Sequence, residues 1–181
     1  MGAGLSDRGK RLRLASIARA EAELEPAGNA NQAGPEIEKY VSLFRETMNH
    51  RAGTQDYSNL SVGYAWCGAF AYYCCLKAGF RIKPEPSEHV NGSLAAVSTW
   101  HDWASLPQRR LFLAPGGVPA AGDIVLFDRL LEEKPLDHLG VVLGVGPDSI
   151  TTAEGNVHNR SGVFTRRLDD HINSYVRLAG S

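Results

Sequence analysis

The hydrophobic pattern of the chain is helical in its first half and strand-like afterwards. Apolar residues at three- and four-residue steps predict a helix over 35–48 with one buried face. A second helix is predicted over 65–78. It is apolar nearly all round, with Lys77 as its only charge, so it should lie in the centre of the fold. Further helices are expected over 6–25 and 92–104.

After Pro107, short β-rich runs alternate with turns that contain Gly, Pro and Asn. The expected strands are 123–127, 138–145, 149–157, 162–168 and 175–178. Helices followed by closely spaced strands predict an α+β fold in which the helices pack on a C-terminal antiparallel sheet. For a chain of 181 residues we expect an N-terminal helix over 1–28 and a single globular unit over 29–181.

Charge and hydropathy exclude several classes of protein. Nineteen basic and twenty acidic residues give a net charge of -1, so no nucleic-acid partner is expected. The uncharged stretch 62–76 is too short to cross a bilayer. The basic residues near the N-terminus precede no apolar core of signal-peptide length. We therefore expect a protein made in the cytoplasm without a signal peptide and without a membrane partner.

Three cysteines, an odd number, do not make a disulfide framework. Cys67, Cys74 and Cys75 lack the paired spacing of a zinc site, and no Gly-rich phosphate loop is present. No cofactor is therefore expected. Cys74 and Cys75 are interpreted as buried packing residues.

Cys67 differs because it lies in the first turn of the apolar helix. Unpaired backbone N–H groups and the positive end of the helix dipole meet there, which favours the nucleophilic thiolate form of a cysteine. The same N–H groups can stabilise an oxyanion. Simple packing is the alternative interpretation of Cys67.

A predicted hairpin brings three polar residues together. If the turn centre lies near Pro147, paired residues sum to 294, so His138 faces Asn156, with Glu154 as a diagonal neighbour on the same face. A sum of 295 would place Glu154 on the other face. Glycines 140 and 144 leave space on the face of His138, and we expect the Cys67 helix to approach there. Such a site would suit a thiol amidase, with a nucleophile, a base and an orienting group.

Four short motifs in order resemble the CHAP domains (cysteine, histidine-dependent amidohydrolase/peptidase) of the papain-like superfamily. The motifs are Trp66-Cys67-Gly68-Ala69-Phe70, the run from Pro119 through Gly122-Asp123 to Phe127, His138-Leu139-Gly140-Val141-Val142, and Glu154-Gly155-Asn156. The resemblance covers about residues 30–178. It implies a papain-like α+β fold with the nucleophile at the N-terminus of a central buried helix.

The resemblance also implies the roles of individual residues. Cys67 is the expected nucleophile, His138 the general base and Glu154 its orienting group, with Asn156 assisting. The Cys67 amide is one oxyanion donor, and Tyr64 is a candidate for the second.

The remaining aromatic and charged candidates have simpler interpretations. Trp66, next to the nucleophile, is expected in the cleft wall, whereas Trp100 and Trp103 are expected in the core. The arginines at 160, 166 and 167 are interpreted as a solvated surface. Some relatives bind calcium, but the loop at Asp56 offers too few oxygen ligands, so no metal is expected.

The family typically cleaves peptidoglycan, in the peptide stem or at the bond between muramic acid and L-alanine. We therefore expect a monomeric bacteriolytic hydrolase that acts on the cell wall through a thioester acyl-enzyme, after phage lysis or injection as an effector. An inhibitor or immunity protein is expected only for an injected toxin. The alternatives are an amidase or acyltransferase on a small amide, and a non-catalytic module that binds the cell wall or a partner.

Overall fold

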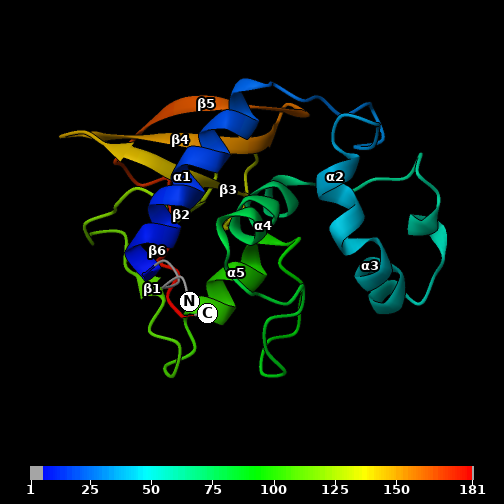
Figure 1. Ribbon diagram of the computed structural model, residues 1–181, viewed down its shortest axis with the longest axis horizontal. Helices are drawn as coiled ribbons and strands as arrows, with labels where there is room; N and C mark the ends of the chain where they lie inside the picture. Colours follow the sequence, from blue (N-terminus) through cyan, green and yellow to red (C-terminus); the bar gives the residue numbers. More distant parts are fainter. Residues whose placement is uncertain (1–5, 181) are drawn as a thin grey trace, which may run out of the picture.

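The computed structural model describes residues 6–180, and the expected α+β architecture is confirmed. Helices precede an antiparallel sheet (Figure 1). The helices are α1 (Asp7–Glu23), α2 (Glu38–Val41), α3 (Arg45–Ala52), α4 (Cys67–Ala78) and α5 (Val97–Ala104). The strands are β1 (Phe112–Leu113), β2 (Ile124–Phe127), β3 (His138–Val145), β4 (Ser149–Val157), β5 (Arg160–Arg167) and β6 (Ile172–Val176).

The six strands form one sheet in the order β1-β6-β2-β3-β4-β5. Helices α1 and α4 pack against each other and against the middle strands β3 and β4 (Figure 1). Helices α2 and α3 lie to one side, beyond α4, in the same view. Within residues 6–180, no helix is both long and apolar enough to cross a bilayer.

Helix α4 is the centre of the core, as its composition predicts. Nine of its twelve residues are buried, including the predicted packing residues Cys74 and Cys75. Burial raises the pKa of both thiols, so each stays in the protonated form. The helix ends at Gly79, whose φ of 97° is a left-handed conformation that glycine adopts without strain. Trp100 and Trp103 are also buried, as expected.

Helix α1 belongs to the same packed unit. Ser6 caps it by accepting the N–H of Gly9 at 3.2 Å. Its buried residues Leu14, Ala18 and Ala22 lie in the core cluster that contains α4. The small side chains of Ala18 and Ala22 let the helix lie close to the sheet and to α4. Residues 1–5 of the segment predicted to precede the main domain lie outside the described residues.

The two faces of the sheet carry separate hydrophobic clusters. Leu139, Val141 and Ala153 face α1 and α4, whereas Val125, Val142 and Ile150 form a smaller cluster on the opposite face. His138 and Glu154 alternate with the residues of the helix-covered face, so they belong to the opposite face. The expectation that α4 would cover the face of His138 is therefore wrong.

The glycines explain this arrangement. A Cβ on Gly140 would lie 2.6 Å from Cγ of Glu154, so this glycine makes room for the carboxylate side chain. A Cβ on Gly155 would lie 2.5 Å from Cβ of Phe70 in α4. The close approach of the helix therefore depends on Gly155, which alternation places on the face opposite Gly140.

Several element boundaries differ from the sequence-based expectation. The helix predicted over 35–48 is divided into α2, a 3-10 turn at Ser42–Phe44, and α3. Helix α5 begins at Val97 because residues 92–96 form an extended turn against the N-terminal part of α4, where Gly68 contacts the Ala95 carbonyl. The edge strand β1, of two residues, was not predicted because so short a run has no detectable period.

We predict that Gly155→Ala lowers the free energy of unfolding by about 1–3 kcal/mol, because the new methyl group must displace α4 from the sheet. Gly144→Ala is the matched control, since a Cβ there has no neighbour within 4 Å. Urea denaturation of both variants measures the difference. Equal stabilities of the two variants would contradict this account of the packing.

Candidate active site

Cys67 is the first residue of α4, which begins two residues later than the predicted helix, so Cys67 lies in the first turn as expected. Its side chain is buried in the core cluster, with 5% of the residue exposed. Trp66 is the N-cap residue and provides no side-chain hydrogen bond to the first turn. The backbone N–H groups of that turn therefore remain for another acceptor near the sulfur.

His138 is the first residue of β3, so its ring lies at the strand end instead of over the middle of the sheet. The imidazole stacks on Phe127, the last residue of β2, with ring centroids 6.2 Å apart. Its Nε2 lies 3.0 Å from Oε2 of Glu154. Both side chains are buried, at 2% and 0% exposed. The ring is therefore fixed by stacking on one side and by a carboxylate at its edge.

The second ring nitrogen of His138 is available to the Cys67 sulfur. Burial lowers the pKa of His138, but hydrogen bonding to the Cys67 thiol and to Glu154 outweighs it and raises that pKa to about 9. Because Glu154 binds Nε2, Nδ1 is the nitrogen that remains for Cys67. Helix α4 itself lies against the other face, and Cys67 and His138 are the first residues of α4 and β3.

Four donors surround the Glu154 carboxylate. Thr152 Oγ1 and Arg166 Nε contact Oε1 at 2.5 and 2.9 Å, and His138 Nε2 and Arg166 Nη2 contact Oε2 at 3.0 and 2.7 Å. Burial raises the pKa of this carboxyl, but the bonds to Arg166 and His138 lower it to about 2. Glu154 is therefore a carboxylate at any physiological pH.

A bulge in the hairpin decides on which face Glu154 lies. Next to the turn, Gly144 pairs with Thr151 and Val145 with Ile150, which is the register that would send Glu154 away from His138. One extra residue, Leu143, restores the predicted register, in which Val142 pairs with Thr152. The predicted contact between His138 and Glu154 therefore depends on this bulge.

Comparison with known proteins supports the same grouping of residues. A sequence model of the CHAP domain matches residues 59–156, which is more than half of the chain and spans Cys67, His138 and Glu154. The chain belongs to the CHAP domain family. Searches of curated proteins and of solved structures found no match.

Asn156 is the third residue of the acid-Gly-Asn motif of this CHAP domain, but its position differs from that of Glu154. It adopts a φ of 62° where β4 leaves its register with β5, and it is half-buried. No hydrogen bond joins its side chain to His138 in residues 6–180, and Nε2 of the ring is already bound by Glu154. The assisting role of Asn156 therefore stays a prediction.

The two aromatic candidates for substrate contact have structural partners. Trp66 is fully buried, stacks on Tyr40 and donates its indole N–H to Asn159 at 3.1 Å. The expectation that Trp66 lines the cleft is therefore wrong. The Tyr64 hydroxyl donates to the Val41 carbonyl at 2.7 Å and cannot also serve as an oxyanion donor. Its ring does line a cavity of about 360 Å³ beside Ala65, with Arg51 at the cavity wall.

Sequence reasoning missed Arg166. Of the three arginines interpreted as solvated surface, this one reaches the buried carboxylate. The available signal was the pairing of β4 with β5, which places Arg166 and Glu154 on one face. Arg160 instead donates to the Glu25 carbonyl, just after the end of α1.

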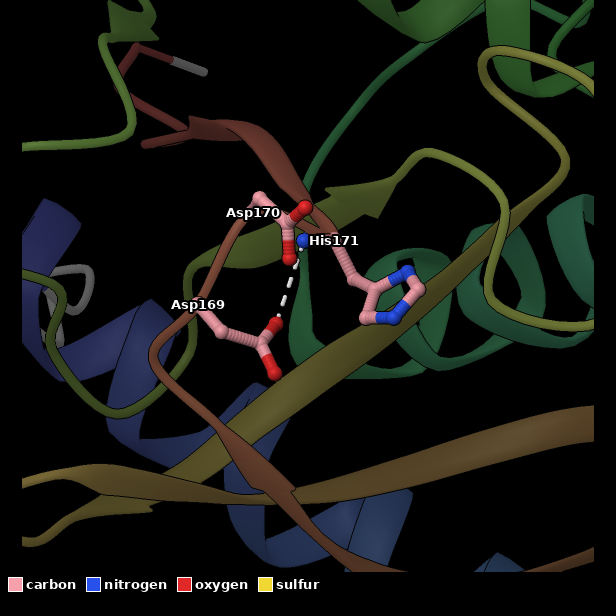
Figure 2. A group of neighbouring side chains, drawn as sticks. All are labelled: Asp169, Asp170 and His171. Carbon is pink, nitrogen blue, oxygen red and sulfur yellow. Dashed lines mark hydrogen bonds between the residues drawn. The ribbon is translucent and has the colours of Figure 1, made fainter.

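A second group of potential ligand residues lies outside this site. Asp169, Asp170 and His171 bring their ligand atoms within 4.8 Å of one another in the turn before β6 (Figure 2). Asp169 accepts the backbone N–H of His171, drawn as the dashed line in Figure 2, and this is the usual role of Asp in a turn. Both aspartates are exposed, so local turn geometry explains the group.

We predict that Cys67→Ala lowers the pKa of His138 from about 9 by at least about one unit, because burial persists while the interaction with the thiol is lost. NMR titration of the ring measures this shift. Folding raises this pKa above 6.5, so the imidazolium stabilises the fold below pH 6.5, and that contribution is lost as the pH rises through about 9.

The matched control is Cys74→Ala, which removes a thiol from the same helix that does not act on His138. It should leave the titration unchanged. An identical His138 titration in wild type and Cys67→Ala would contradict the contact between sulfur and ring.

Proposed function

We propose that this CHAP domain is a cysteine amidase or endopeptidase that hydrolyses amide bonds of bacterial peptidoglycan through a thioester acyl-enzyme. The observation that supports this most strongly is the buried contact between His138 and Glu154 at 3.0 Å, in which the Cys67 thiol acts on the same ring and raises its pKa. Family membership supports hydrolysis of an amide or peptide bond as the reaction class. The choice of peptidoglycan rests on the resemblance to the family.

In the first half of the proposed reaction, the Cys67 sulfur attacks the carbonyl carbon of the amide, while His138 holds the proton of the thiol. The carbonyl oxygen becomes an oxyanion, which the Cys67 N–H at the start of α4 can stabilise. When the C–N bond breaks, the imidazolium gives its proton to the departing amine. The acyl group remains on sulfur as a thioester.

In the second half, His138 accepts a proton from water, and the resulting hydroxide attacks the thioester carbon. The sulfur leaves as a thiolate, and the acyl fragment is released as a carboxylic acid. Glu154 keeps the imidazole in one orientation and stabilises its protonated form through both half-reactions. This role requires an ionised Glu154, which agrees with its lowered pKa.

The cavity beside the start of α4 favours a polar peptide substrate. It lies next to Ala65, two residues before Cys67, and its wall contains Arg51, Asn91, Ser93 and Thr99. Arg51 forms an exposed ion pair with Glu85 at 2.8 Å, so it can exchange this partner for a substrate carboxylate. Peptidoglycan stem peptides carry such carboxylates. Under this proposal the protein acts on the cell wall, and an immunity-type inhibitor is expected only if it is an injected toxin.

We predict that Cys67→Ala and His138→Ala each lower cleavage of a defined muropeptide at least about 10³-fold. The nucleophile and the base act together, so either one alone gives little rate acceleration. Glu154→Gln should cost less, since the amide keeps the shape and loses only the charge. Mass analysis of the fragments measures the loss and identifies the scissile bond.

Two controls make the result decisive. Cys75→Ala changes a buried thiol of the same helix and should keep wild-type cleavage. Circular dichroism should show that each inactive variant is folded. Full cleavage by Cys67→Ala would reject the proposed mechanism, and wild-type cleavage of small amides with no action on muropeptides would reject the proposed substrate.

A further inference from the structure

Arg166 approaches the proposed triad from behind the carboxylate. Its guanidinium makes a two-pronged contact with Glu154, Nε to Oε1 at 2.9 Å and Nη2 to Oε2 at 2.7 Å. The side chain is 19% exposed and the carboxylate is fully buried. Arg166 lies beyond residues 59–156, the part of the chain that matches the CHAP family.

The surrounding strands are shaped to carry this side chain to Glu154. Arg166 pairs with Ile150, which lies four residues before Glu154 in β4 and on the same face. Its guanidinium lies over the ring of Phe164, 4.7 Å from the centroid, on the way to the carboxylate. Gly162 pairs with Glu154, and a Cβ on Gly162 would lie 3.1 Å from the Phe164 ring, so the glycine leaves room for this ring. The contact between Arg166 and Glu154 therefore follows from the register and packing of β5.

We propose that Arg166 is a positioning residue of the proposed hydrolase, which keeps Glu154 ionised and in a single orientation so that Glu154 can hold His138. This inference rests on the proposed function of Cys67 and His138. Arg166 acts through Glu154, and both prongs contact the carboxylate and not the imidazole.

The charges around the carboxylate explain why Arg166 should matter most in acid. The charged groups that act on Glu154 are Arg166 from β5 and His138 from β3, and Thr152 from β4 adds a neutral hydroxyl. Without Arg166, burial would oppose ionisation with only His138 to balance it. Glu154 would then take up a proton at a higher pH, and the neutral carboxyl would no longer stabilise the imidazolium. On the other side of the site, the Lys134 ammonium, from the loop between β2 and β3, is a further charge that acts on Cys67, and it pairs with Glu132.

The test measures the rate at which iodoacetamide alkylates Cys67 as a function of pH, which requires no substrate. Tandem mass spectrometry locates the label on Cys67 and separates it from Cys74 and Cys75. In Arg166→Met, which keeps side-chain length over Phe164 but loses the charge, the acid midpoint of the profile should rise by about one pH unit or more. Near pH 7 the rate should change little, because Glu154 is ionised there in both proteins. Arg167→Met, the same change at the exposed neighbouring position, should leave the profile unchanged.

A double-variant comparison separates positioning from general structural support. In a Glu154→Gln background the side chain at 154 cannot titrate, so adding Arg166→Met should not move the midpoint further. This double variant also leaves no guanidinium facing an uncharged amide. If Arg166→Met alone does not fold, Arg166→Lys keeps the charge but loses the two-pronged contact, and its midpoint should rise in the same direction by a smaller amount.

Superimposable profiles of wild type and folded Arg166→Met would overturn the proposal, as would an equal shift in the Glu154→Gln background. Muropeptide cleavage provides the second readout. Arg166→Met should lower kcat at the acid end of the pH profile with KM nearly unchanged, and a rise in KM alone would also overturn the proposal. If the alkylation profile shifts as expected but wild type cleaves no muropeptide, the proposed function fails and the positioning role of Arg166 stands.

Discussion

The buried charge of Glu154 constrains this end of the fold more than any other group. A carboxylate with no exposed surface must receive its hydrogen bonds from the protein, and here three strands supply them through His138, Thr152 and Arg166. Removal of one charged partner of a buried pair typically costs about 3–5 kcal/mol. The same bonds that satisfy the carboxylate also fix the imidazole. Stability and the proposed chemistry therefore depend on one cluster.

The packing of α4 brings the sulfur to that cluster from the opposite side of the sheet. Gly155 allows the helix to approach β4, and Gly140 leaves the other face open for the carboxylate side chain. Cys67 and His138 meet because one begins α4 and the other begins β3. A site at the strand end is thus compatible with a helix on the far face, and the opposite face stays free for Glu154 and Arg166.

Much of this could be predicted from the sequence because the signals are local. The apolar run of α4, its glycine stop and the two long hairpin strands are each encoded within a short window, and β3 and β4 begin and end at the expected residues. The face on which α4 packs could not be predicted, because it depends on contacts between segments that are distant in the chain. The bulge at Leu143 could not be predicted either, because one extra residue does not visibly change the alternation of apolar and polar residues. Arg166 was misjudged because an arginine near a strand end usually faces solvent.

In the proposed mechanism, the Cys67 sulfur carries the acyl group between the two half-reactions. Cleavage of a defined muropeptide in the presence of hydroxylamine tests it most directly, because hydroxylamine competes with water for a thioester. We predict that part of the acyl product appears as hydroxamate, in a share that rises with hydroxylamine concentration, and that Cys67→Ala forms none. Release of the carboxylic acid alone, at the same rate at every hydroxylamine concentration, would contradict the account.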